Sequence, residues 1–178
     1  MKTYIVLLRG VMPTGKNRVP MAQLRELLSD NGFEAVRTWI QSGNVVLRTA
    51  LSPAELEESV RQLIKTHIGP ELAIIARTGE QLQQLLDENP FREGYDISRV
   101  FYVSFQEYPS SEKVESLLAQ DFAPEVLAIT STAAYMYIPH TYGRGKLSNN
   151  FLERKLGVAA TTRNFNTLKK LIELSGQG

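Results

Sequence analysis

Three polar segments of this 178-residue chain carry residue types and spacings that could hold a negatively charged ligand. The first, residues 9–18, contains two glycines and three basic side chains between a predicted strand and a predicted helix. Glycines let a ligand approach the backbone closely, and a helix N-terminus with basic neighbours attracts anions. The segment is therefore either a phosphate-type binding loop or a purely structural Gly/Pro loop.

The same segment matches a phosphate-binding loop only in part. Gly10 and Gly15-Lys16 have the G-x-x-x-x-G-K spacing, but Asn17 stands where Ser or Thr would ligate magnesium. The following helix is expected to begin only at Pro20, three residues too late for that motif. The candidate ligand contacts in this segment are Arg9, Lys16 and Asn17.

The second segment is a turn between two predicted strands. Its residues Gln41, Ser42 and Asn44 surround Gly43, which suits the backbone of an ordinary hairpin turn. The functional alternative is that Gln41 and Asn44 present amide groups at a rim shared with residues 9–18.

The third segment is the richest in basic and amide side chains. Residues 142–150 form a glycine-rich basic turn that leads into a helix predicted to be capped by Ser148, and residues 160–166 are a second polar approach to a helix. Helix starts offer unpaired backbone N–H groups, whereas asparagine is a poor helix former that either caps a helix or bonds a ligand. The candidate contacts here are Arg144, Lys146, Asn149, Asn150, Arg163 and Asn164.

The cysteine and histidine content of the chain argues against metal-dependent and Ser-His-Asp chemistry. The chain has no cysteine, and its two histidines, His67 and His140, lie far apart without a carboxylate motif, so no metal site and no cofactor are expected. No Ser-His-Asp spacing is visible either. His67 is expected to be a packed or helix-end residue, while His140 lies at the mouth of the basic turn.

Composition indicates a soluble globular protein of the cytoplasm that does not enter membranes. Hydrophobic residues make up 43% of the chain and charged residues 22%, and no apolar run approaches the ~18 residues that cross a bilayer. The net charge of +1 is unevenly distributed: +4 over residues 1–50, −8 over residues 51–139 and +5 over residues 140–178. Basic ends that met in space would form an anion-attracting patch, although they could equally be two solvated faces.

Apolar periodicity predicts an α+β protein made of two similar halves. The first is expected to run β-α-β-β-α-β, and the second β-α-β-β-α with a helix in place of the last strand, which is the element order of ferredoxin-like units. Mixed or antiparallel sheets with helices packed on them would follow.

The expected boundaries are residues 1–77 for the first subdomain, 78–98 for a helical connection, and 99–178 for the second subdomain with its C-terminal helix. The predicted strands are 3–9, 33–40, 44–49, 71–76, 99–105, 126–130 and 133–138.

The three polar segments in this order resemble a bacterial family catalogued as domain of unknown function 1697. The resemblance rests on residues 4–10 with 15–17, on 41–46, and on 146–157 with 160–167, and it runs from near residue 3 to near residue 174. The chain departs from the family at Met12-Pro13-Thr14, where an Asn-Val-Gly stretch is common. The resemblance implies an α+β fold of two similar subdomains and implies no activity.

Three functions fit these patterns. The first is binding of a phosphate-bearing ligand, nucleic acid or nucleotide, at a basic site formed by the N- and C-terminal segments. The second is a metal-free enzyme acting on a small anionic substrate, with His140 or Tyr142 moving a proton. The third is a protein-interaction module that uses the acidic middle of the chain. The oligomeric state does not follow from the sequence.

Overall fold

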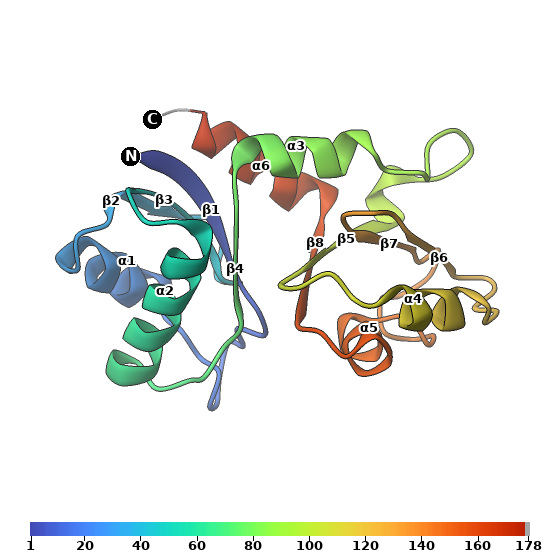
Figure 1. The fold of residues 1–178 in the computed structure, drawn as a ribbon, viewed down its shortest axis with the longest axis horizontal. Coiled ribbons are helices and arrows are strands. Elements are labelled where there is room, and N and C mark those ends of the chain that lie inside the picture. Colours follow the sequence, from blue (N-terminus) through green and yellow to red (C-terminus); the bar gives the residue numbers. More distant parts are fainter. Residues whose placement is uncertain (177–178) are drawn as a thin grey trace. The chain divides into compact units, whose positions relative to one another are not determined.

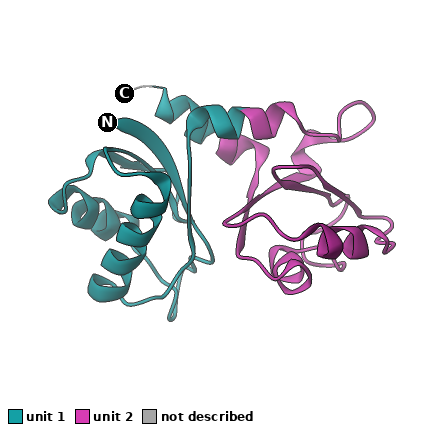
Figure 2. Cartoon of the chain, viewed as in Figure 1, with its two compact units in different colours: residues 1–83, 169–178 teal, residues 84–168 magenta. Residues whose placement is uncertain are grey.

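Two four-stranded antiparallel sheets and the helices packed on them make up this α+β protein (Figure 1). The structure is a computed structural model and describes residues 1–176. The chain divides into two compact units, which Figure 2 colours separately: unit 1 is residues 1–83 with 169–178, and unit 2 is residues 84–168. The division falls within two helices, α3 (Gly79–Asp87) and α6 (Phe165–Ser175). The C-terminal part of α6 therefore belongs to unit 1.

Unit 1 has the predicted β-α-β-β-α-β order. Its elements are β1 (Lys2–Leu8), α1 (Met21–Asp30), β2 (Glu34–Thr38), β3 (Asn44–Thr49), α2 (Pro53–His67) and β4 (Ile74–Arg77). The strands lie in the order β2-β3-β1-β4, so β1 is central, and apolar side chains are buried on both of its faces. Ser52 caps α2 in a reciprocal capping box with Glu55, and Pro53 is the first helical residue.

The core of unit 1 lies between one face of this sheet and helices α1 and α2. Alternate residues of β1, namely Tyr4, Val6 and Leu8, pack there against side chains such as Leu24 and Leu56. This alternation follows from the period of two in a strand and 3.6 in a helix. His67 ends α2 as an exposed residue in its last turn.

Unit 2 has the same element order, which corrects one expectation. Its elements are β5 (Val100–Phe105), α4 (Ser111–Leu118), β6 (Val126–Ile129), β7 (Ala134–Tyr137), α5 (Asn149–Leu156) and β8 (Ala160–Asn164), and a short 3-10 helix, η1 (Ile97–Arg99), precedes β5. The strand order is β6-β7-β5-β8.

The expectation of a helix in place of the last strand was wrong, because residues 160–164 form β8. All five residues of β8 pair with β5, from Asn164 opposite Phe101 to Ala160 opposite Phe105. The segment lacks an apolar alternation, yet Ala160 and Thr161 are buried. Pairing with β5 supplies the backbone hydrogen bonds that the short polar segment could not make alone.

An equivalent carboxylate secures the outer strand of each sheet. The Ala76 N–H of β4 donates to Glu57 Oε2 of α2 at 2.9 Å, and the Ala160 N–H of β8 donates to Glu153 Oε2 of α5, also at 2.9 Å. A helix thus satisfies an edge-strand donor that no neighbouring strand reaches. Burial raises the pKa of Glu57, although this hydrogen bond and Arg77 act in the opposite direction.

The two units differ most in the loops that leave equivalent strands. Twelve residues, 9–20, join β1 to α1, whereas five, 106–110, join β5 to α4. Conversely, eleven residues, 138–148, join β7 to α5, whereas three, 50–52, join β3 to α2. The two units therefore have the same topology, and each carries one long loop of its own. Long ordered loops are where function concentrates.

Gly43 should be the most sensitive glycine of unit 1. Its φ is +86°, and a Cβ there would lie 2.8 Å from both Leu8 Cβ and Val11 Cγ2. We expect Gly43→Ala to lower the free energy of unfolding by about 3 kcal/mol, from left-handed strain and overpacking together. The matched control is Gly32→Ala, with φ +91° but open space around the added atom, which should cost about 1 kcal/mol. If urea unfolding showed the same loss of unfolding free energy for both variants, the contacts of the added Cβ with Leu8 and Val11 would not matter.

Candidate functional site

The twelve candidate residues fall into two groups of six, one in each unit. Unit 1 holds Arg9, Lys16, Asn17, Gln41, Ser42 and Asn44, and unit 2 holds Arg144, Lys146, Asn149, Asn150, Arg163 and Asn164. Most residues of each group lie in or beside the long loop of their own unit, whereas Arg163 and Asn164 belong to β8. We call residues 9–20 the N-terminal loop and residues 140–147 the basic loop.

A buried carboxylate organises the basic loop. The Glu125 side chain is only 2% exposed and lies immediately before β6. Its Oε2 is 2.9 Å from His140 Nε2, at one end of the loop, and its Oε1 accepts the Leu147 N–H at 3.0 Å, at the other end. Since a buried carboxylate is costly unless it is bonded, both ends of the loop are held to this one group.

The middle of the basic loop also contacts Glu125. A Cβ on Gly145 would lie 2.6 Å from Glu125 Oε2, so only glycine allows the backbone to approach this closely. Gly145 is flanked in sequence by Arg144 and Lys146, both of which are exposed. The loop therefore carries two solvent-facing cations on backbone that is fixed against a buried anion.

Tyr142 and Asn149 join the basic loop to α5 and β8. The Asn149 N–H donates to the Tyr142 hydroxyl at 2.8 Å, and the Asn149 side chain bonds Ala160 O at 3.0 Å and the Thr162 hydroxyl at 2.8 Å. The Tyr142 ring packs on Phe101, with centroids 4.8 Å apart. Burial raises the pKa of Tyr142, partly offset by its bonds to Asn149 and Thr162, so the phenol stays protonated at neutral pH.

The two helix starts of unit 2 are less open than the sequence suggested. Ser148 Oγ accepts the Phe151 N–H at 3.1 Å, as predicted for the cap of α5, and Asn164 Oδ1 accepts the Thr167 N–H at 2.9 Å at the start of α6. With Asn149 also bonded internally, these asparagines act as caps and braces. Among the candidates near α5, Arg144, Lys146 and Asn150 are the exposed ones.

Arg163 lies on the other face of the sheet from the basic loop. It stands opposite Tyr102 in the register of β8 and β5, whereas its neighbour Thr162 bonds Asn149 on the helix-covered face. Successive strand residues point to opposite faces, so Arg163 does not join Arg144 and Lys146. It donates to the Thr161 hydroxyl and to Thr162 O. Burial lowers the pKa of Arg163 to about 10, which leaves the guanidinium charged at neutral pH.

In unit 1, the turn 41–44 lies against the N-terminal loop. The Leu8 N–H donates to Gly43 O at 2.9 Å, and the Gln41 side chain donates to Val19 O at 2.9 Å. Asn44 is buried and donates to Trp39 O and to the Ser42 hydroxyl. The amide donors of Gln41 and Asn44 therefore hold the turn together.

The N-terminal loop presents its cations beside an uncapped helix. Lys16 and Arg18 are exposed and Arg9 is half-buried. Pro20 is the N-cap of α1 and no side chain caps it, nor does an acidic residue occupy the first turn. The Asn17 backbone closes the loop by accepting the Met12 N–H at 2.9 Å. This arrangement favours anions, since both the side chains and the helix dipole are positive.

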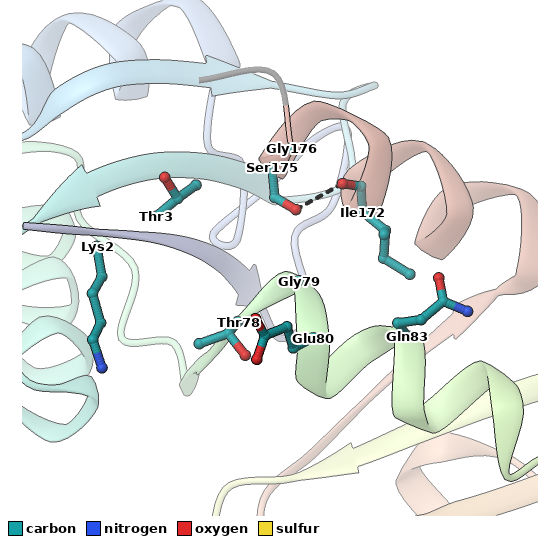
Figure 3. Close-up of a pocket in the computed structure, with 9 residues that line it drawn as sticks. All are labelled: Lys2, Thr3, Thr78, Gly79, Glu80, Gln83, Ile172, Ser175 and Gly176. Carbon is teal, nitrogen blue, oxygen red and sulfur yellow. Dashed lines mark hydrogen bonds between the residues drawn. The ribbon is translucent and has the colours of Figure 1, made fainter.

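A separate cavity of about 590 Å³ lies in unit 1, where β1, the start of α3 and the end of α6 meet (Figure 3). Figure 3 shows Lys2, Thr78 and Glu80 at this cavity. Gly79 allows α3 to approach Ser175 closely, because a Cβ would collide with the Ser175 hydroxyl. None of the twelve candidate residues lines the cavity.

Sequence reasoning missed two residues of the basic loop's surroundings. Glu125 was counted only as part of the acidic middle, because nothing in its local sequence shows that it is buried. Arg99 ends η1, and its guanidinium donates to His140 O at 3.4 Å. The partner of His140 lies 15 residues upstream in the sequence, and only the fold brings the two side chains together.

Several acids of the middle segment have structural partners. Glu58 and Glu71 pair with Arg61, Glu55 completes the capping box of α2, and Glu57 bonds the Ala76 N–H.

Over residues 1–176, no group of three or more His, Cys, Asp or Glu side chains is placed to hold a metal ion. Within the same residues, no helix has the length and apolarity to span a membrane.

Comparison with known proteins gives a family and a fold. A family model described as "protein of unknown function (DUF1697)" matches residues 1–135 and so ends before the basic loop. The conserved bacterial protein SP0830 from Streptococcus pneumoniae has a similar structure, with a TM-score of 0.71 and 23% sequence identity over 97% of this chain and 98% of that one. A search of curated proteins found no match.

Gly145 offers a direct test of the contact that shapes the basic loop. We expect Gly145→Ala to lower the free energy of unfolding by about 1–3 kcal/mol, because the added methyl collides with the Glu125 carboxyl. It should also speed hydrogen exchange at the Leu147 amide. The control is Gly143→Ala, where φ is +85° but the space is open, and which should leave that amide protected. If the hydrogen-exchange rate of the Leu147 amide were unchanged in Gly145→Ala, the packing of Gly145 on the Glu125 carboxyl would be contradicted.

Proposed function

The chain belongs to the DUF1697 family, whose function is unknown, and from the geometry of its basic loop we propose that it binds a phosphate-bearing ligand, either a nucleic acid or a nucleotide. The observation that carries the proposal is the anchoring of this loop on Glu125. Because His140, Gly145 and Leu147 all contact one buried carboxylate, Arg144 and Lys146 stand on a backbone that is already ordered before a ligand arrives. Preorganised cations lose less conformational entropy on binding than cations on a mobile loop.

Phosphate is the anion that best fits this combination of groups. Arginine binds phosphate oxygens through a planar pair of donors, and lysine binds them as a compact charge. The side-chain donors of Asn149, Gln41 and Asn44 are already bonded within the protein. Recognition would then depend mainly on charge and on the ligand's backbone phosphates rather than on its bases.

The N-terminal loop is the second group that supports the proposal. Lys16 and Arg18 are exposed beside the uncapped start of α1, a place where backbone N–H groups and basic side chains favour the same kind of anion. A ligand with several phosphates could contact either loop. The substitution Lys16→Ala tests the contribution of the N-terminal loop to ligand binding separately from that of the basic loop.

Binding should depend on salt and on the cations of the basic loop. In fluorescence anisotropy with labelled single-stranded RNA, duplex DNA and a labelled nucleotide at two salt concentrations, we expect affinity for a nucleic acid to fall steeply with salt. Lys146→Ala and Arg144→Ala should each reduce the slope of log affinity against log salt by about 0.7–0.9, the value of one phosphate contact. A nucleotide ligand would bind with a shallower slope.

The matched control is Lys155→Ala, which removes an exposed cation from the far end of α5 in the same unit. It should leave both the affinity and the slope as in the unaltered protein. An equal loss in Lys155→Ala would mean that only net charge matters. Absence of binding to all three probes at low salt would refute the proposed function.

A further inference from the structure

The pair formed by His140 and Glu125 has the geometry of a base and the group that orients it. The Glu125 carboxylate is 2% exposed and keeps both oxygens bonded, one to His140 Nε2 at 2.9 Å and one to the Leu147 N–H at 3.0 Å. The His140 side chain is 24% exposed, so the ring reaches solvent while its position is set from inside. Anchoring the loop requires only a donor at residue 140, and an imidazole offers a second nitrogen besides.

The second nitrogen of His140 is available as a base. A carboxylate accepts hydrogen bonds, so in the neutral imidazole the hydrogen is assigned to Nε2 and the lone pair to Nδ1. Across residues 1–176, Nδ1 has no hydrogen-bond partner. A histidine whose far nitrogen is fixed by a carboxylate is the arrangement that general-base catalysis uses.

Three cationic residues belong to the same loop or bond to it. Arg144 and Lys146 flank Gly145, whose backbone lies against the Glu125 carboxyl, and the Arg99 guanidinium donates to the His140 carbonyl. Such groups would attract an anionic substrate and stabilise negative charge that develops on it. The basic loop thus carries a base held by a buried acid and two exposed cations, and Arg99 bonds the loop from η1.

We propose that the basic loop is a hydrolytic site for phosphate esters, in which His140 is the general base and Glu125 its positioning residue. This inference rests on the proposed function. Nδ1 of His140 takes a proton from water while the water oxygen forms a bond to phosphorus. The bond from phosphorus to the leaving oxygen breaks, and the imidazolium returns the proton to that oxygen. The products are the hydrolysed phosphate and an alcohol, with no further reactant.

The test is hydrolysis of bis(4-nitrophenyl) phosphate, a diester, and 4-nitrophenyl phosphate, a monoester, by the full chain, followed through the release of nitrophenol. We expect turnover of at least one ester. A diester preference points to nucleic-acid substrates, and a monoester preference to small phosphorylated molecules. Lys155→Ala, purified in the same way, should retain the full rate.

Two substitutions separate catalysis from loop anchoring. His140→Gln keeps a donor for Glu125 but removes the base, so kcat should fall by about 10²–10⁴-fold, the range for general bases. Glu125→Gln keeps an acceptor for the Leu147 N–H, but its new N–H faces His140 Nε2 and moves the ring hydrogen to Nδ1. Its kcat should fall by about 10²-fold or more, with the loss in kcat rather than in KM.

The outcomes distinguish the two proposals. Anisotropy binding without hydrolysis of either ester overturns the catalytic inference and leaves the binding function standing. Hydrolysis that persists in His140→Gln, or that falls in Glu125→Gln only through KM, also overturns it. Absence of both binding and hydrolysis refutes both proposals. Circular dichroism of each variant confirms that a lost rate does not reflect lost folding.

Discussion

The arrangement of the basic loop depends on the cost of burying a carboxylate. Glu125 is withdrawn from water, and an ionised carboxyl is stable there only if hydrogen-bond donors replace its hydration. The donors come from His140 and Leu147, and the glycine at 145 lets the backbone close over the group. A loop with two glycines and two basic residues, which would otherwise be mobile, is thereby given one shape.

The scaffold beneath this loop is used twice in the chain. Both units place a strand with two neighbours at the centre of an antiparallel sheet, and both satisfy an outer-strand N–H with a glutamate from the second helix, Glu57 or Glu153. The loops do not follow this repetition. The N-terminal loop has a short equivalent in unit 2, and the basic loop has a short equivalent in unit 1. Shared elements are constrained by packing, whereas loops that leave the sheet are free to differ, so chemistry concentrates in the loops.

The candidate residues divide by what their side chains already do. Asn44, Asn149 and Asn164 use their polar atoms to close a turn, brace a strand and cap a helix. Arg144 and Lys146 contribute no such bond and extend from ordered backbone into solvent. The sequence could not separate these roles, because an asparagine that caps and an asparagine that binds a ligand have the same local pattern.

The amino-acid sequence by itself determined most of the elements, because their signals are local. The continuous apolar run of β1, the capping box at Ser52 and the cap at Ser148 each depend on residues within a few positions of one another. The tertiary structure alone decided that residues 160–164 form a strand, that Arg163 faces away from the basic loop, and that His140 meets Glu125. Each of these depends on a partner distant in the chain: β5 supplies hydrogen bonds to β8, and the fold buries Glu125. Local patterns do not specify such long-range contacts.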